Sequence, residues 1–239
     1  MFESIIIVFC YENELKGADM DLVQAYKFAE TSNINIITDI PKNKNVDCDF
    51  NHVKNNNDFT RIVDDIFQKN PEKLFIYFSG HGKSIENNSY YLLPSGEIFM
   101  INDLFYRIKK LRNDSEIVMI NDCCHLDNFN LFMKLKDNNL QVNPSCDFFP
   151  KQKIIVINST SKNDQKAIMN HSGSSFSKVL FKFISDGNLL LSNLNSNISS
   201  FFKNKQKPIM MLSQPIKFCF PWLVKRKIYI FEGKLYIEK

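Results

Sequence analysis

Glycine is scarce in this chain. Only 7 of the 239 residues are glycine, about 3%, whereas soluble proteins usually contain about 7%. Left-handed backbone is inexpensive only at glycine, so the chain has few positions for turns of that kind. Two of the seven, Gly80 and Gly82, flank a single histidine, His81. This clustering marks the segment as one where the backbone approaches something closely.

Long apolar runs and paired cysteine motifs are also missing. The longest apolar runs, such as residues 5–10, are far shorter than the roughly 20 residues that span a bilayer, so we expect no membrane partner. The N-terminus has Glu3 and no basic segment, which argues against a signal peptide. The six cysteines show no CxxC spacing. We therefore expect reduced thiols and a cytoplasmic location.

Neither sign of charge dominates the composition. The 30 basic and 26 acidic residues give a net charge of +4, and the richest basic run covers only residues 225–227. A nucleic-acid-binding surface needs basic residues gathered on one face, so nucleic acid is not an expected partner. With 44% hydrophobic and 23% charged residues, the chain is typical of a globular protein with one full core.

Apolar runs alternate with segments of helical spacing. Strands are predicted at residues 4–10, 34–38, 73–79, 89–93, 116–121, 153–158 and 208–213. Helices are predicted over 19–31, 59–69 with Asp58 as cap, 102–111, 174–185 and 190–203. Loops are predicted over 39–57 and 137–152, and a hairpin over 227–238. The alternation predicts an α/β fold whose mostly parallel sheet is covered by helices on both faces. We expect one domain, residues 1–220, extended by a small β-hairpin at residues 221–239.

Reactive side chains follow the predicted strands where binding sites form in parallel sheets, beyond the carboxyl ends. His81 follows strand 73–79, and Cys124 follows strand 116–121. A cysteine and a histidine at neighbouring strand ends can act as nucleophile and base, because the thiolate is the reactive species and an imidazole can accept its proton. The backbone N–H groups of Gly82 and Cys124 are candidate oxyanion donors.

Other interpretations of these residues compete with catalysis. A single histidine is more often structural, and a buried cysteine usually packs as a small hydrophobe. Zinc held by Cys123, Cys124, His125 and His81 is disfavoured, because consecutive residues in extended backbone point in opposite directions. What favours catalysis is that His81 and Cys124 each come soon after a long buried strand.

Two segments resemble the active-site motifs of the metacaspases, which are caspase-like cysteine proteases. Residues 77–82, Tyr-Phe-Ser-Gly-His-Gly, are similar to that family's Y-S-G-H-G, and residues 122–125, Asp-Cys-Cys-His, to its D-x-C-H-S-G. Further segments resemble the family's L-R-G-C-x-N-D, I-x-D-D-x-L, D-Q-x-A and G-x-F-T in the same order, at residues 15–21, 101–104, 164–167 and 173–177. The resemblance implies a caspase-like three-layer fold.

The resemblance also implies roles for the matched residues. His81 corresponds to the catalytic histidine and Cys124 to the nucleophile, while Asp21, Ser79 and Asp122 correspond to residues that line the S1 pocket. Carboxylates near the nucleophile favour a cationic side chain through charge-assisted hydrogen bonds. We therefore expect a protein or peptide substrate cleaved after Arg or Lys, and not after Asp.

The sequence departs from the family pattern in two places. Leu126-Asp127 replaces the Ser-Gly that follows the Cys-His pair. Asp103 matches one residue of the family's calcium site, but Asn102 replaces its neighbour and the other ligands have no clear match. No cofactor is required by the expected chemistry, and calcium is left open.

The sequence is compatible with two functions. One is a cysteine endopeptidase that works through an acyl-enzyme at a Cys-His dyad. The other is a catalytically degenerate caspase-fold protein with a binding or regulatory role. Retention of both His81 and Cys124 together with the pocket acids favours the first, and loss of the Ser-Gly keeps the second open.

Overall fold

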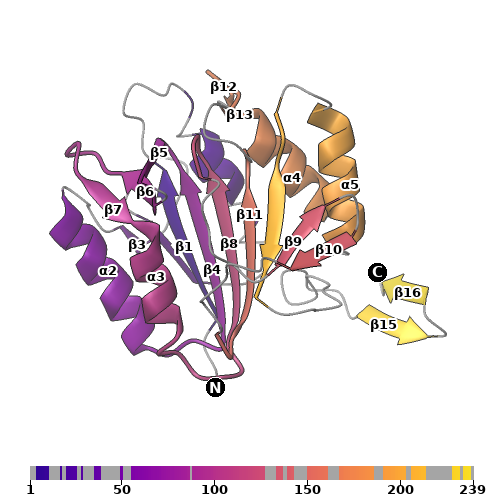
Figure 1. Cartoon of the computed structure of the whole chain (residues 1–239), viewed down its shortest axis with the longest axis horizontal. Coiled ribbons are helices and arrows are strands. Elements are labelled where there is room, and N and C mark those ends of the chain that lie inside the picture. The colour runs from indigo at the N-terminus through magenta and orange to yellow at the C-terminus, as the bar shows by residue number, and fades with distance from the viewer. Residues whose placement is uncertain are drawn as a thin grey trace.

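The structure is a computed structural model that describes residues 4–10, 17, 20–25, 28, 35–38, 49–50, 55–86, 88–126, 133–136, 139–142, 150–160, 167–185, 191–202, 206–213, 228–231 and 234–237. A nine-stranded sheet forms its centre (Figure 1), in the order β10-β9-β14-β11-β8-β4-β1-β2-β3. Its strands are β1 Ser4–Cys10, β2 Asn35–Thr38, β3 Asp49–Phe50, β4 Lys73–Ser79, β8 Glu116–Asp122, β9 Met133–Lys136, β10 Asn139–Val142, β11 Lys153–Asn158 and β14 Ile209–Leu212. The six strands from β3 to β11 in that order are parallel, and β14, β9 and β10 add antiparallel pairs.

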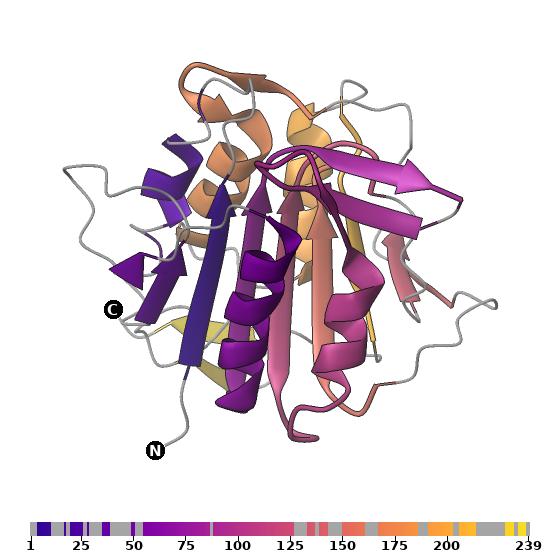
Figure 2. The same ribbon diagram turned by 90° about the vertical axis from the view of Figure 1, so that its left-hand side faces the viewer.

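Helices lie on both faces of this sheet, as the alternating sequence predicted. The helices α2 Asn56–Gln68 and α3 Ile101–Ile108 cover one face, which is turned toward the viewer in Figure 2. The helices α4 Ser175–Ser185 and α5 Leu191–Phe202 cover the other face. Residues 20–25 are also helical, and the ring of nearby Phe28 meets Phe181 of α4 at 5.4 Å between centroids. The predicted three-layer α/β fold is therefore confirmed.

Smaller sheets complete the described structure. The strands β5 Gly82–Ile85, β6 Asn88–Leu92 and β7 Ile98–Met100 form an antiparallel sheet, and β12 Met169–Asn170 pairs with β13 Gly173–Ser174. The predicted C-terminal hairpin is present as β15 Ile228–Phe231 paired with β16 Lys234–Ile237. The division of the chain into residues 1–220 and 221–239 stays a prediction.

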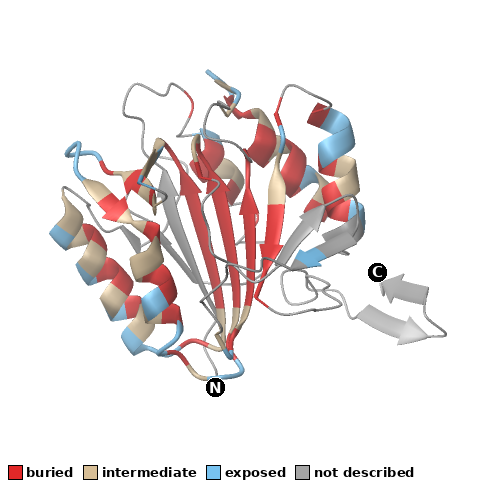
Figure 3. Cartoon of the chain, viewed as in Figure 1, coloured by how far each residue is buried: buried red, intermediate tan, exposed pale blue. Residues whose placement is uncertain are grey.

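Side chains of the central strands alternate between two apolar layers. In β4, Leu74, Ile76 and Phe78 join a core cluster with the apolar face of α2. The intervening Phe75 and Tyr77 point the other way, and the Tyr77 ring lies 5.5 Å from that of Phe181. These strands are buried on both faces (Figure 3), which is why their sequences are continuous apolar runs.

Several boundaries differ from the sequence prediction. Helix α2 begins earlier than expected, because Asn55 and not Asp58 is its cap: the Asn55 side chain accepts a hydrogen bond from the Asp58 N–H at 3.0 Å. The predicted loop 39–57 contains the short strand β3, and the predicted loop 137–152 contains β10. Strands β5 and β7 were not predicted. All four are short: β7 has only three apolar residues in a row, and β3, β5 and β10 mix polar with apolar residues. Their pairing therefore depends on neighbouring strands.

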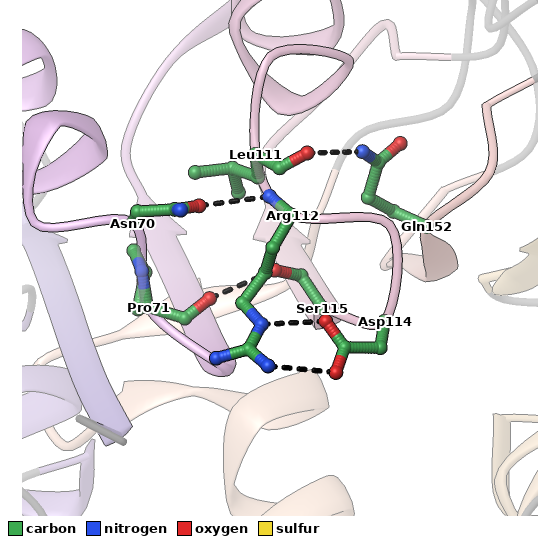
Figure 4. Close-up of polar contacts among 7 residues, drawn as sticks. All are labelled: Asn70, Pro71, Leu111, Arg112, Asp114, Ser115 and Gln152. Atoms are coloured by element: carbon green, nitrogen blue, oxygen red, sulfur yellow. Dashed lines mark hydrogen bonds and ion pairs between the residues drawn. The ribbon is translucent and has the colours of Figure 1, made fainter. Parts of the chain in front are cut away.

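Polar contacts tie the strand entries together at the edge of the sheet opposite the strand carboxyl ends (Figure 4). The Ser115 hydroxyl donates to the carbonyl of Pro71 at 2.8 Å, which joins the segments leading into β8 and β4. The Gln152 amide, before β11, donates to the carbonyl of Leu111 at 2.7 Å. These bonds fix the relative starting points of three parallel strands, and thereby the alignment of the side chains at their other ends.

Candidate active site

The predicted nucleophile and base lie on touching loops at the carboxyl ends of β4 and β8. The two strands are parallel neighbours whose last residues, Ser79 and Asp122, are paired. A Cβ atom built on Gly82 would lie only 2.2 Å from the carbonyl oxygen of Cys124. Glycine is therefore needed beside His81, because any side chain at residue 82 would push the Cys124 loop away. Both predicted oxyanion donors, Gly82 and Cys124, belong to this contact.

The two adjacent cysteines have different environments. Cys123 is fully buried in the core cluster, and this burial, with the nearby Asp122 charge, raises the pKa of its thiol well above the usual value. Cys124 is partly exposed, and its sulfur accepts a hydrogen bond from the backbone N–H of Ala167 at 3.2 Å. Of these two cysteines, Cys124 is the more accessible to a reagent or substrate.

The three predicted S1 residues, Asp21, Ser79 and Asp122, meet on the α4 side of the sheet, where all three are fully buried. The Ser79 hydroxyl donates to one Asp21 oxygen at 2.8 Å, and the backbone N–H of Ser174 donates to the other at 2.8 Å. The Ser177 hydroxyl donates to Oδ2 of Asp122. The structure thus brings together these three residues from separate motifs, and adds two serines that the sequence reasoning missed.

Burial disfavours the ionised forms of Asp21 and Asp122. Burial raises the pKa of Asp21 from 3.8 to about 7, and the charge of Asp122 raises it further, although Ser174, Ser79 and Lys178 partly oppose the shift. Burial also raises the pKa of Asp122, although hydrogen bonds from Ser174, Ser177 and Ser159 partly oppose the shift. A buried pair of acids is unfavourable when both are ionised, unless an opposite charge compensates them.

The raised pKa of Asp21 predicts that the free energy of unfolding depends on pH. The folded state retains the Asp21 proton up to about pH 7, whereas the unfolded state releases it near pH 4, so stability should fall as pH rises between these values. Asp21→Asn removes this loss and should raise the free energy of unfolding at pH 8 by about 2–4 kcal/mol. Urea unfolding of both proteins at pH 4 and pH 8 measures the effect. Equal stabilities at pH 8 would contradict it.

A chain of buried amides supports the Cys124 loop from the opposite face of the sheet. The Tyr91 hydroxyl donates to Oδ1 of Asn121, whose Nδ2 donates to Oδ1 of Asn158 at 2.8 Å, and Nδ2 of Asn158 donates to the carbonyl of Leu126. The Leu126 side chain is fully buried in the core cluster. Leucine in place of the resembled family's serine therefore anchors the loop by packing. Asp127 lies outside the described residues.

Two hydroxyl groups that follow β11 also hold the Cys124 loop in place. The carbonyl of Cys123 accepts hydrogen bonds from the side chains of Ser159 at 3.1 Å and Thr160 at 3.3 Å. Sequence reasoning missed these residues and Asn158. The available clue was position, because all three are polar and come at or just after the end of a predicted buried strand, as His81 does.

The remaining predicted positions concern metal ions. Asp103 lies in the first turn of α3, where its carbonyl accepts a hydrogen bond from the Arg107 guanidinium at 3.2 Å. Within the described ranges, no three or more His, Cys, Asp or Glu side chains are grouped closely enough to hold a metal ion. Calcium binding is left open. None of the described helices combines the length and the apolar character needed to cross a membrane.

Comparison with known proteins places this arrangement in a family. The family model of the caspase domain of peptidases matches residues 5–219. The chain belongs to the caspase domain family. The family is one of cysteine peptidases, which act on proteins, and this agrees with the general class expected from the sequence. No curated protein gives a significant match to the chain.

Solved structures share the caspase-like fold. Protein GSU0716 from Geobacter sulfurreducens has a TM-score of 0.64 and 11% sequence identity, with 90% of this chain and 95% of that chain covered. Caspase-1 from Spodoptera frugiperda has a TM-score of 0.56 and 14% identity, with coverages of 87% and 85%. The Drosophila initiator caspase Dronc has a TM-score of 0.55 and 11% identity, with coverages of 87% and 77%. Identities this low establish the fold of this caspase domain and nothing finer.

Proposed function

We propose that this caspase domain is a cysteine endopeptidase that cleaves after Arg or Lys, with Cys124 as nucleophile and His81 as general acid and base. The observation that carries the proposal is the buried acid pair beside the Cys124 loop. Asp122 directly precedes the two cysteines. It is fully buried, and its charge raises the pKa of the neighbouring Asp21. A cationic P1 side chain would neutralise the two carboxylates.

Acylation begins with the Cys124 thiolate. Its sulfur attacks the carbonyl carbon of the P1 residue, which forms a C–S bond and moves the carbonyl π electrons onto oxygen. The backbone N–H groups of Gly82 and Cys124 stabilise that oxyanion. When the tetrahedral species collapses, the C–N bond breaks and the protonated His81 gives its proton to the departing amine. A thioester to Cys124 remains.

Deacylation reverses these roles with water in place of the amine. Neutral His81 removes a proton from a water molecule, and the water oxygen attacks the thioester carbon. The C–S bond then breaks, the new carboxyl group leaves with the N-terminal part of the substrate, and Cys124 returns as a thiolate. Proton and charge are balanced over the cycle, so these steps call for no cofactor, and calcium is left open.

The charge of the pocket argues for a basic P1 residue. A P1 aspartate would bring a third carboxylate against Asp21 and Asp122, whereas Arg or Lys brings the opposite charge. Like charges placed together in a buried site cost several kcal/mol. The preference proposed for this chain is the one that its resemblance to the metacaspases implies.

Cleavage of matched fluorogenic peptides tests the proposal. Peptides that differ only at P1 should be cleaved with kcat/KM at least about 10²-fold higher for Arg or Lys than for Asp, since the discrimination is between an attractive and a repulsive charge in one pocket. Labelling by an Arg chloromethylketone should fall on Cys124. Cleavage after Asp would contradict the specificity. Failure to cleave any peptide or to label Cys124 would favour a catalytically degenerate binding protein.

A further inference from the structure

The Cys124 sulfur has a hydrogen-bond donor that belongs to none of the predicted catalytic positions. The backbone N–H of Ala167 donates to Sγ at 3.2 Å. A donor of this kind interacts more strongly with a thiolate than with a neutral thiol, because hydrogen bonds to charged acceptors are about twice as strong. The Ala167 N–H is therefore placed to stabilise the form of Cys124 that attacks the substrate.

A buried glutamine fixes the position of the Ala167 segment. The N–H of Ile168, the next residue, donates to Oε1 of Gln206 at 3.3 Å, and Nε2 of Gln206 donates to the carbonyl of Ser159 at 2.8 Å. Gln206 is fully buried and lies just before β14. Because its amide uses both ends, the glutamine joins the 167–168 segment to the end of β11.

The same connection leads back to the cysteine loop. The Ser159 hydroxyl donates to the carbonyl of Cys123 at 3.1 Å. Gln206 is therefore linked to the Cys124 loop along two routes, one through Ser159 and one through Ala167. Such a closed set of bonds sets the separation between the Ala167 nitrogen and the Cys124 sulfur.

We propose that Gln206 is a positioning residue that holds the Ala167 N–H on Sγ of Cys124, so that the thiolate is stabilised before a substrate arrives. The inference rests on the proposed role of Cys124 as nucleophile. It extends that role to a backbone donor and to a glutamine outside the motifs that define the site.

A pair of matched substitutions tests the proposal. Gln206→Met keeps the side-chain length but removes both hydrogen bonds. Gln152→Met is the control, because Gln152 is also buried and donates to a backbone carbonyl at 2.7 Å, but at the far edge of the sheet. The rate of Cys124 carboxamidomethylation by iodoacetamide, followed by mass spectrometry, should fall about tenfold in Gln206→Met, the order expected for one hydrogen bond to a charged group. It should change less than twofold in Gln152→Met.

Two further variants separate positioning from a loss of structure. Gln206→Glu retains an acceptor for the Ile168 N–H and, when protonated, a donor for the Ser159 carbonyl, so it should recover part of the alkylation rate that Gln206→Met loses. Ala167→Pro removes the donor itself and should slow alkylation as Gln206→Met does, and this variant decides the matter if Gln206→Met does not fold. With a P1 arginine peptide, Gln206→Met should lower kcat and leave KM within about twofold.

The outcomes distinguish this inference from the proposed function. Folded Gln206→Met and Ala167→Pro proteins that alkylate at the unsubstituted rate would overturn the inference, even where peptide cleavage is intact. Equal slowing in Gln206→Met and Gln152→Met would also overturn it, since the effect would then follow stability alone. An unsubstituted protein that alkylates rapidly at Cys124 but cleaves no peptide would instead overturn the proposed function.

Discussion

Replacing Cys124 by alanine is expected to lower kcat/KM for a P1 arginine peptide by at least about 10³-fold, because the proposed thioester intermediate cannot form without the Cys124 sulfur. The fold should be retained. Cys124 is partly exposed and lies outside the main core cluster. Cleavage of a fluorogenic peptide by the purified variant, with circular dichroism as a check of folding, measures the effect.

The neighbouring cysteine supplies the matched control. Cys123→Ala removes a buried thiol whose pKa is raised by its surroundings, and it should reduce stability by about 1 kcal/mol through a small cavity. Its peptidase activity should stay within about tenfold of the unsubstituted protein. If Cys123→Ala eliminates cleavage while Cys124→Ala retains it, the nucleophile has been assigned to the wrong member of the pair.

The sequence allowed the candidate site residues to be grouped correctly in space because parallel strands all end at one edge of the sheet. His81 and Asp122 come at or just after the end of a long apolar run, and pairing of β4 with β8 places those ends side by side. The positions of two glycines also pointed to the site. Residue 82 must be glycine because a Cβ there would overlap the carbonyl oxygen of Cys124. A Cβ on Gly173, which has a φ of +99°, would lie 2.6 Å from the Asp21 carboxylate.

The supporting residues could not be found in the same way. Gln206 reaches the site because α5 returns the chain to β14, and nothing in its local sequence distinguishes it from a surface glutamine. The donor at Ala167 is a backbone N–H, which every residue except proline has, so residue type gives no clue. Short strands such as β5, with the sequence Gly-Lys-Ser-Ile, have no apolar periodicity and depend on a partner strand.

Leu126 shows how the structure changed one interpretation of the sequence. The loss of the resembled family's Ser-Gly left open the possibility of a degenerate site. In the fold, the Leu126 side chain is buried in the core and its carbonyl accepts a hydrogen bond from Asn158. Leu126 therefore anchors the loop by its side-chain packing and by its carbonyl, next to the acid pair and Cys124.

The acid pair gives the second large expected effect. Asp122→Asn should lower kcat/KM for a P1 arginine peptide by about 10²–10³-fold, because truncating one partner of a buried charge pair costs several kcal/mol. The loss should be much smaller for the neutral isostere citrulline at P1. The decisive quantity is the ratio of kcat/KM for arginine to that for citrulline, which should fall by at least about tenfold in the variant.

Asp114→Asn is the matched control, since Asp114 is exposed and bonds Arg112 at the far edge of the sheet. Asp122 directly precedes the two cysteines, so the rate of Cys124 alkylation by iodoacetamide must be measured alongside. An unchanged alkylation rate with a collapsed arginine-to-citrulline ratio assigns the loss to the pocket. An unchanged ratio would mean that Asp122 does not contact the P1 charge.

The pocket hypothesis also predicts that activity and stability change in opposite directions. The pKa of buried Asp122 is raised by burial, so the ionised carboxylate weakens the fold, and Asp122→Asn should resist urea better than the unsubstituted protein at pH 8. The stability gain follows from burial alone, so it shows only that the ionised carboxylate is costly to the fold. The loss of the arginine preference is what assigns that carboxylate to the P1 charge, and a cost in stability kept for function is a common trade-off.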